Sequence, residues 1–219
     1  MKYYIFPAIA LSLFYSCTNS PKPAPVTDKA SDVASAVINS AKEELPIRNF
    51  IKKFKVVPFP FYYLGWARNE YYKSRSFELN FNSTDSLFYK RADGPVYGYA
   101  LLADTSKFYS LIYFGTAEDL YPVLVTYSKN GDQLSSETLI VHGCGSDCGL
   151  KYCSYTAQIN KDLGIYIADT LKYEGRCDSA DHFNPNSDST FIFAKTGQVD
   201  KTGTIKLGEE TTQSFKGIR

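Results

Sequence analysis

The sequence predicts a mainly β protein: an antiparallel meander of about eight short strands, preceded by one or two N-terminal helices. Two observations predict this class. Tyrosine and phenylalanine number 18 and 15 among 219 residues, against one Met and one Trp, and aromatic side chains pack well on pleated sheets. From residue 96 onward, short apolar runs alternate with turn signals, which is the all-β pattern. A curved sheet, a sandwich and a partial propeller-like arrangement all fit it.

The β region is expected to cover residues 96–208. Its strands are predicted at 96–104, 108–114, 122–128, 136–142, 151–159, 164–173, 189–195 and 202–208. Asn130-Gly131 is the strongest turn signal, because a type I′ hairpin turn needs positive φ at both central positions. Lys195–Gln198 is expected to be another turn. The spacing suggests two meanders of four strands, which either an internal duplication or plain regularity explains.

Residues 28–95 are expected to be helical and mixed. Apolar residues three to four apart predict a helix over 28–44, which Pro46 ends. Pro58 and Pro60 exclude a central strand in the part of the chain that contains them. Shorter helical or turn pieces are expected around Phe50–Phe54, Asn69–Arg75 and Ser83–Lys90, and residues 209–219 are expected to form a tail.

Residues 1–16 have the pattern of a secretory signal peptide. Lys2 is followed by an uncharged, mostly apolar run from Tyr3 to Tyr15 and then by the small residue Ser16. As a helix, a run of about 13 residues spans only about 20 Å, which is short of the roughly 30 Å hydrocarbon core. A permanent transmembrane anchor is therefore the weaker interpretation.

Phe14-Tyr15-Ser16-Cys17 resembles the lipobox of bacterial lipoproteins, with Ser16 at the small position before the cysteine. The resemblance covers residues 1–17 and departs from the usual Leu and Ala or Ser at Phe14 and Tyr15. It implies cleavage before Cys17, diacylglycerol on the thiol and a fatty acid such as palmitate on the amine. A plain cleaved signal peptide is the alternative. Thr18, rather than Asp, points to the outer membrane under the familiar sorting rule.

The expected location is therefore the cell envelope, as an outer-membrane lipoprotein that faces the periplasm or the cell surface. Membrane lipid is the first partner, through acylated Cys17, and residues 17–27 form a flexible tether rich in proline and small polar residues. With 24 basic and 23 acidic residues the net charge is +1. This balance excludes the broad basic footprint of a nucleic-acid binder.

Four further cysteines lie in the last third of the chain: Cys144, Cys148, Cys153 and Cys177. An even number in an exported protein indicates two disulfides, with three possible connectivities. Pairing of Cys144 with Cys153 and of Cys148 with Cys177 is preferred. Free thiols and a metal site are the alternatives.

A metal site is the weaker hypothesis, and none is expected. Its candidate ligands are His142 and His182, which flank the cysteines, together with the alternating Asn184, Asn186 and Asp188. The cysteine spacing differs from the paired Cys-x-x-Cys of common zinc modules. The calcium-loop pattern fails where Gly and a bidentate Glu are needed. A solvated loop is the ordinary interpretation.

An aromatic cluster around Tyr62, Tyr63 and Trp66 is the candidate binding surface, since exposed aromatic residues make good interaction sites. It suggests a platform for a glycan or an envelope protein. The preferred interpretation, however, is that these rings are core residues that cover the end of a sheet, and the binding surface is the alternative.

No nucleophile elbow, zinc-protease motif, phosphate loop or dinucleotide fingerprint is present. No catalytic residue or cofactor is therefore assigned. The leading hypothesis is a non-catalytic binding or assembly module of the envelope. The alternatives are an envelope hydrolase or carbohydrate-active enzyme that uses two unassigned carboxylates, and an inhibitor or immunity-type protein that uses the loop 143–150.

The mature region also resembles uncharacterised Bacteroidota-type lipoproteins of similar size. Residues 50–61, 86–90, 126–139 and 144–149 carry this resemblance. It implies the envelope compartment and a β architecture, and it brings no site residues.

Overall fold

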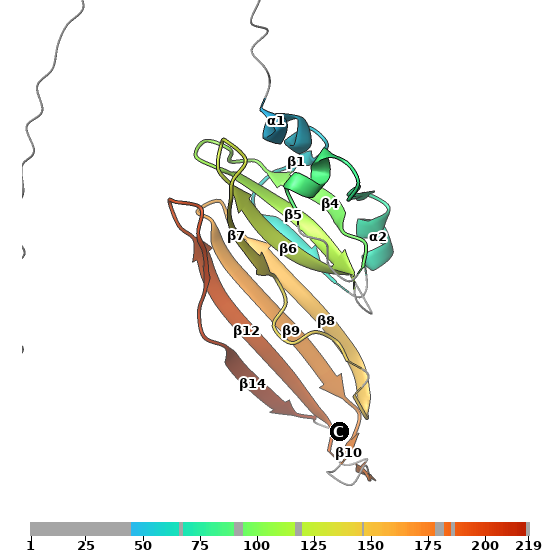
Figure 1. The fold of residues 1–219 in the computed structure, drawn as a ribbon. Coiled ribbons are helices and arrows are strands. Elements are labelled where there is room, and N and C mark those ends of the chain that lie inside the picture. The colour runs from blue at the N-terminus through green and yellow to red at the C-terminus, as the bar shows by residue number, and fades with distance from the viewer. Residues whose placement is uncertain are drawn as a thin grey trace, which may run out of the picture. The chain divides into compact units, whose positions relative to one another are not determined.

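The computed structural model describes residues 45–65, 68–89, 94–116, 120–145, 147–177, 182–184 and 187–217. The fold is mainly β, as expected, with three mostly antiparallel sheets and few short helices (Figure 1). Two sheets are six-stranded and neither closes into a barrel. The signal peptide, Cys17, the tether and the helix expected over 28–44 lie outside the described residues. Within the ranges given above, no helix is both long and apolar enough to cross a membrane.

The first large sheet, sheet A, has the strand order β1-β4-β5-β6-β7, with β3 paired to β4 beside β1. The pairing of β1 with β4 is parallel and the other pairings are antiparallel. Its strands are β1 (Lys55–Val57), β3 (Phe77–Glu78), β4 (Tyr97–Leu102), β5 (Tyr109–Thr116), β6 (Leu120–Tyr127) and β7 (Gln133–Thr138).

The second large sheet, sheet B, has the order β13-β12-β9-β8-β2, with β14 also paired to β12. Its strands are β2 (Phe61–Leu64), β8 (Leu150–Ile159), β9 (Gly164–Tyr173), β12 (Ser189–Val199), β13 (Ile205–Leu207) and β14 (Thr211–Lys216). The small sheet pairs β10 (Arg176–Cys177) with β11 (Phe183–Asn184), and the helical pieces are α1 (Pro46–Ile51), α2 (Asn69–Lys73) and the 3-10 turn η1 (Thr84–Leu87).

The eight expected strands correspond to β4–β9, β12 and β13. They form two four-stranded meanders, one in each large sheet. The additional strands are the short β1, β2 and β3, the small-sheet strands β10 and β11, and β14, which lies within the expected tail 209–219. Pro58 and Pro60 lie between β1 and β2, and both of these strands are at sheet edges.

Two turn predictions were wrong in detail. Asn130-Gly131 closes the β6–β7 hairpin, but only Gly131 has positive φ, at +102°. The turn is therefore not type I′, which needs positive φ at both positions. Within it, Oγ of Ser128 accepts the N–H of Asn130 at 3.2 Å. Lys195–Gln198 is not a turn, since β12 continues to Val199.

Sheet A is the middle layer, and β5 shows why its residues are nearly all buried. Ile112 and Phe114 face a core shared with sheet B. Leu111 and Tyr113 face a second core, which also contains Phe50 of α1 and other residues of the N-terminal segment. Alternate strand residues point to opposite faces, so both faces of this strand need apolar side chains. The helical piece expected around Phe50–Phe54 is α1, which ends at Ile51, and the rings of Phe50 and Phe54 meet edge to face with centroids 5.3 Å apart.

Candidate binding pocket

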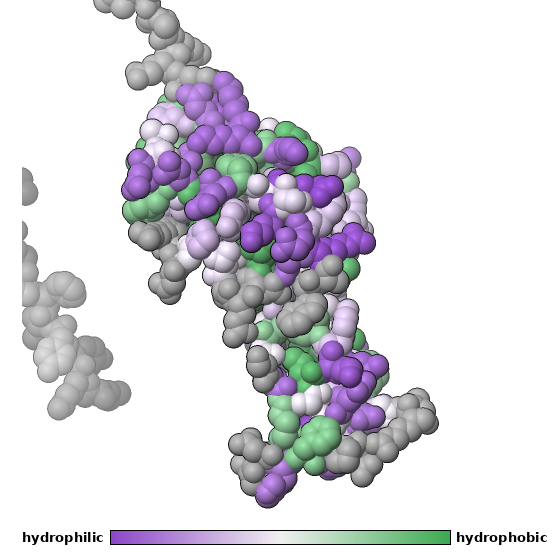
Figure 2. All heavy atoms as spheres, turned by 90° about the vertical axis from the view of Figure 1, so that its right-hand side faces the viewer, coloured by the Kyte–Doolittle hydropathy of each residue, from purple (hydrophilic) through white to green (hydrophobic). Residues whose placement is uncertain are grey.

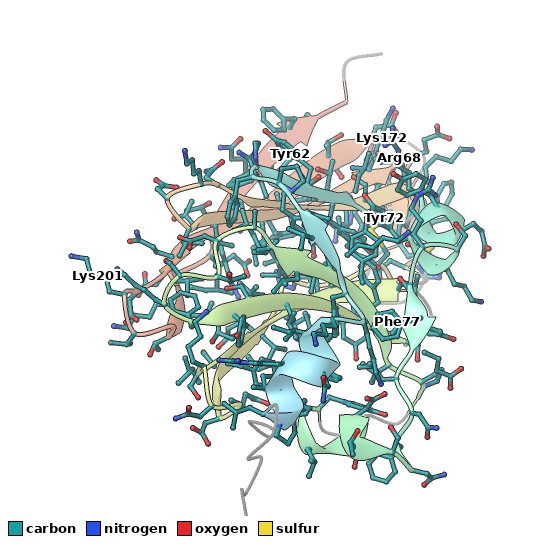
Figure 3. The ribbon with its side chains drawn as sticks, turned by 90° about the horizontal axis from the view of Figure 1, so that it is seen from above. Tyr62, Arg68, Tyr72, Phe77, Lys172 and Lys201 are labelled. Atoms are coloured by element: carbon teal, nitrogen blue, oxygen red, sulfur yellow. A yellow bond between two sulfur atoms is a disulfide. The ribbon has the colours of Figure 1, made fainter. Side chains whose placement is uncertain are left out.

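A pocket of about 390 Å³ lies beside the edge strand β2, where tyrosines from several elements meet. It is bounded by Tyr62, Tyr63, Leu64, Arg68, Tyr71, Tyr72, Tyr99 and Thr156. In Figure 3, Tyr62, Arg68 and Tyr72 lie on the same side of the molecule. Figure 2 shows hydrophilic and hydrophobic residues interspersed on one face of the molecule.

Strand alternation divides the tyrosines of β2 between core and solvent. Tyr63 is 1% exposed and belongs to the shared core, whereas Tyr62 is 58% exposed. The same division occurs in α2, where Tyr72 is buried and Tyr71 is exposed. Neighbouring tyrosines therefore supply a rigid floor and an accessible rim.

Hydrogen bonds fix the floor of the pocket. The hydroxyl of Tyr72 accepts the backbone N–H of Leu64 at 3.1 Å. The hydroxyl of Tyr63 donates to the carbonyl oxygen of Leu120 at 2.7 Å. These bonds join α2 to β2 and β2 to β6, so the pocket is formed before any ligand binds.

Burial raises the pKa of Tyr72, and it also raises the pKa of Tyr99. Both hydroxyls therefore keep their protons at neutral pH, and they act as neutral donors and acceptors. The rings of these two residues meet edge to face, with centroids 5.6 Å apart. Such a contact adds to the rigidity of this wall.

Cations border the tyrosines. The guanidinium of Arg75 lies 3.6 Å from the ring centroid of Tyr71, a cation–π contact. Arg68 is the charged member of the lining. The pocket thus offers aromatic faces, phenol hydroxyls and one guanidinium, which suit stacking and hydrogen bonding to a polar, planar or polyhydroxylated ligand.

Sequence reasoning found part of this site. It named Tyr62, which is exposed at the rim of the pocket, and Tyr63, which lies in its floor; Trp66 lies outside the described residues. Arg68, Tyr99 and Thr156 were missed. They come from the start of α2, from β4 and from β8, and no local pattern links them.

The cysteines form two disulfides in the preferred pairing. Cys144 bonds to Cys153 of β8, and Cys148 bonds to Cys177 of β10. The first bond ties the segment that follows β7, residues 139–149, to sheet B, and the second ties it to β10 of the small sheet. Residues 139–142 were expected as the end of a strand, but β7 stops at Thr138. In Figure 1 this segment runs along β8 and β9.

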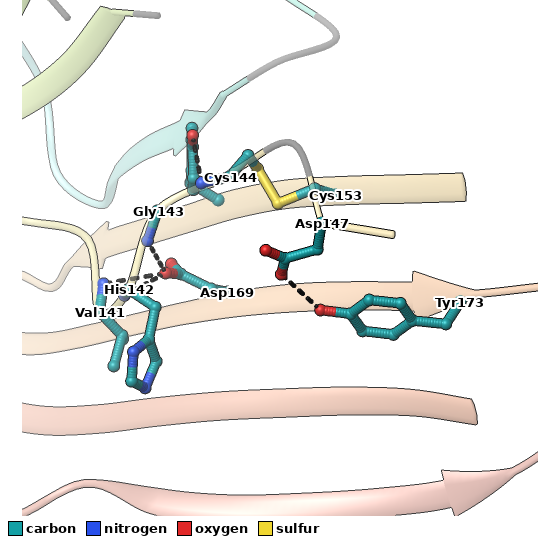
Figure 4. Close-up of a disulfide and its surroundings, with 9 residues drawn as sticks. Val141, His142, Gly143, Cys144, Asp147, Cys153, Asp169 and Tyr173 are labelled. Atoms are coloured by element: carbon teal, nitrogen blue, oxygen red, sulfur yellow. Dashed lines mark hydrogen bonds between the residues drawn. A yellow bond between two sulfur atoms is a disulfide. The ribbon is translucent and has the colours of Figure 1, made fainter. Parts of the chain in front are cut away.

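A buried carboxylate holds the same segment. Oδ2 of Asp169 accepts the backbone N–H groups of Val141, His142 and Gly143 at 3.1, 2.6 and 2.8 Å (Figure 4). The next N–H, that of Cys144, donates to the Tyr155 hydroxyl at 2.7 Å.

The segment is also held at its far end, where the Tyr173 hydroxyl donates to Asp147 at 2.8 Å. Four successive N–H groups and the Cys144–Cys153 disulfide thus fasten residues 141–144 to sheet B, and the Cys148–Cys177 disulfide adds a link to the small sheet.

The candidate metal ligands have other partners or are dispersed. Nε2 of His142 lies 2.9 Å from a Glu210 carboxylate oxygen. The carboxylate of Asp188 accepts the N–H of Gly175 at 3.0 Å. Asn184 lies in β11, His182 directly precedes it, and Asn186 is outside the described residues. In the part of the chain that the structure describes, no group of three His, Cys, Asp or Glu is arranged to hold a metal ion.

A second pocket, of about 430 Å³, lies among the turns at one end of the sheets. Its acidic residues organise those turns: Asp104 accepts the N–H of Ser106 at 2.9 Å, and Asp200 accepts that of Thr202 at 2.9 Å. Hydrogen bonds from the hydroxyl and the N–H of Thr202, with others to the same carboxylate, lower the pKa of Asp200 to about 2. Its carboxylates therefore have a structural role, and we regard the tyrosine pocket as the candidate site.

Comparison of the chain with protein-family models, curated proteins and solved structures finds no match in any of the three.

Proposed function

We propose that this protein is a non-catalytic binding module of the cell envelope, anchored through acylated Cys17, and that the tyrosine pocket is its ligand site. One observation carries the proposal: a preformed concavity lined by exposed and buried tyrosines and one arginine. Aromatic residues and arginine dominate interaction sites because they bury much surface and lose little conformational freedom. The lining residues contain no carboxylate, histidine or cysteine.

Two disulfides give weak support to an extracytoplasmic location, since such bonds persist in oxidising compartments. The signal peptide and Cys17 supply the rest of that argument, from sequence. Labelling with a radioactive fatty acid tests the anchor. We expect label in the wild-type chain and none in Cys17→Ala; label that persists in the variant contradicts lipidation at this residue.

An inhibitor or immunity-type role is the second candidate, and one observation favours it. The segment 143–150 is exposed at Gly145, Asp147 and Cys148, yet it is braced by both disulfides. Rigid exposed loops bind partners with little entropic cost. An envelope hydrolase is favoured less, because the lining of the tyrosine pocket lacks the paired carboxylates of a glycosidase.

A crosslinked pull-down from envelope fractions tests the pocket. The bait is the full chain, and the test variant is Tyr62→Ala/Tyr71→Ala, which truncates the two exposed rim tyrosines. Leu87→Ala is the control, because Leu87 is 67% exposed in η1 and does not line this pocket. We expect material that the wild type and the control retain and the double variant loses. Equal retention by all three proteins contradicts the pocket as the site.

A further inference from the structure

The outer face of sheet B, opposite the shared core, continues from the tyrosine pocket. Tyr62 and Thr156 line the pocket and also point outward from β2 and β8. In β9, Ile165 and Ile167 point into the core, so Tyr166 between them points outward. Tyr166 is 39% exposed. The pocket therefore opens onto a sheet surface that carries further exposed aromatic residues.

One row of this face runs across four strands in register. Tyr62 is opposite Gln158, Gln158 is opposite Tyr166, and Tyr166 is opposite Thr196. Adjacent strands are about 4.8 Å apart, so the two tyrosines are about 10 Å apart. That distance is close to the length of one disaccharide unit in an extended β-linked chain, in which every second sugar presents the same side.

The side chains of this face are uncharged along the row and hydroxyl-rich around it. The neighbouring outward positions are occupied by Thr156, Thr170 and Ala168, and the charged side chain of β9 on this face, Lys172, is six residues from Tyr166. Six strand residues correspond to about 20 Å. The nearest outward cation at the far end of the row, Lys206 of β13, is paired with Asp200 at 3.4 Å, and Arg68 in the pocket can donate hydrogen bonds to sugar hydroxyls. The hydroxyl and amide groups of the row itself match a neutral polyhydroxylated ligand.

A second copy of the chain is the competing occupant of such a face. A sheet that packs face to face on another sheet normally presents apolar residues toward it. In the row only the two tyrosines are apolar, and Gln158 stands between them. The hydrogen-bonding groups that remain would lose water without gaining partners in a sheet-on-sheet contact, whereas a sugar supplies hydroxyls to each of them.

We infer that an extended, uncharged β-linked polysaccharide strand binds across the outer face of sheet B, from the tyrosine pocket along Tyr62, Gln158, Tyr166 and Thr196. This inference rests on the proposed binding function and names its ligand class. Pyranose rings stack on the two tyrosines, and the glutamine and threonine bind sugar hydroxyls. The strand runs perpendicular to the β-strands.

Titration calorimetry with three defined sugars tests the inference. The full chain, in a detergent without a sugar headgroup, is titrated with cellobiose, cellohexaose and maltohexaose. The α-linked maltohexaose is the control for geometry, because its chain coils. We expect cellohexaose to bind about tenfold more tightly than cellobiose, since it reaches a second aromatic platform, and to bind more tightly than maltohexaose.

Two matched variants locate the ligand. Tyr166→Ala should reduce cellohexaose affinity about tenfold, to that of cellobiose, and leave cellobiose binding unchanged. Tyr152→Ala is the control, because this tyrosine is 47% exposed and lies opposite Lys172, away from the row. Both substitutions are at exposed positions, and unchanged melting temperatures will show that the fold is intact.

The possible failures are distinguishable. If cellobiose and cellohexaose bind equally well, or if both variants weaken cellohexaose alike, the row is not the binding path, while the pocket still binds. If no sugar binds, the inferred ligand class is wrong. The proposed binding function of the pocket is then tested by the envelope pull-down alone. A dimer in sedimentation analysis that Tyr166→Ala dissociates would assign the face to a second copy and overturn the inference.

Discussion

Oδ2 of the buried Asp169 accepts the backbone N–H of His142 at 2.6 Å. The same oxygen accepts the N–H groups on either side, those of Val141 and Gly143. Asp169 is 0% exposed and belongs to β9. A carboxylate in the sheet thus replaces a neighbouring strand as the hydrogen-bonding partner of the crossing segment.

Removing this carboxylate should destabilise the protein strongly. Asp169→Ala leaves three N–H groups without their acceptor, and we expect the free energy of unfolding to fall by about 4 kcal/mol. The control is His142→Ala, which keeps its backbone N–H and loses a half-exposed pair with Glu210. We expect that variant to lose about 1 kcal/mol or less. Urea unfolding with the disulfides intact measures both losses. Equal losses would contradict the role of the Asp169 carboxylate in holding residues 141–143.

The two disulfides should differ in what they contribute. Cys148 and Cys177 are 29 residues apart, and Cys144 and Cys153 are 9 apart. A longer closed loop restrains the unfolded chain more, so the expected contributions are about 3.5 and about 2.5 kcal/mol. Replacing each pair by alanines and comparing urea midpoints tests this order. A larger loss from the shorter loop would show that native-state contacts outweigh chain entropy.

Gly149 should not tolerate a side chain. Its φ is +78°, and a Cβ atom there would overlap the carbonyl oxygen of Gly175. We expect Gly149→Ala to cost about 3 kcal/mol, from backbone strain and from displacement of the segment that carries Cys177. Gly145→Ala is the control, because its Cβ would approach Asp147 only to 3.6 Å. Thermal melts that coincide for the two variants would refute this account.

Stability should fall in alkali through a buried tyrosine pair. Burial raises the pKa of Tyr127 from its ordinary value of 10.0 to about 12, and it also raises the pKa of Tyr113, whose hydroxyl is 2.9 Å away. Because the folded pKa lies above the unfolded one, this contribution is complete below pH 10 and is lost as the pH rises to about 12.

Tyr127→Phe tests this pH dependence. The variant should lose about 1 kcal/mol at pH 8, because the hydrogen bond to the Phe88 carbonyl is removed. Between pH 10 and 12 its stability should then fall less steeply than that of the wild type. Urea unfolding across this range gives both slopes, and parallel slopes would assign the alkaline loss to other groups.

Short apolar runs separated by turn signals made most of the strands of sheets A and B predictable. The prediction of 164–173 coincides with β9, whose apolar residues alternate toward the shared core. By contrast, β14 is exposed along its whole length and has no apolar period. It is a strand because it pairs with the edge of β12. No local sequence pattern indicates that this edge is available.

The run Leu139–Val141 was misleading for a related reason. It is apolar because it packs into the shared core, and this gave it the composition of a strand. Leu139 still donates its N–H to the Pro122 carbonyl oxygen of β6 at 2.8 Å, but the N–H of Val141 goes to the side chain of Asp169 in β9 rather than to a neighbouring strand. The spacing and number of apolar residues indicate burial, but they do not indicate which group accepts the backbone hydrogen bonds.

The candidate site was predictable only where alternation exposes a ring, as at Tyr62. Tyr99 and Thr156 reach the pocket because β4 and β8 lie beside β2 and α2 in space. Such proximity depends on how the two sheets stack, which a single sequence does not specify.

The passage from β1 to β2 gives one edge strand to each large sheet. A single stretch of ten residues, 55–64, therefore protects two edges at once, those of β4 and β8. Detachment of this stretch would uncover backbone hydrogen-bonding groups on both sheets together. The resistance of the protein to aggregation thus depends on the first residues of its β fold.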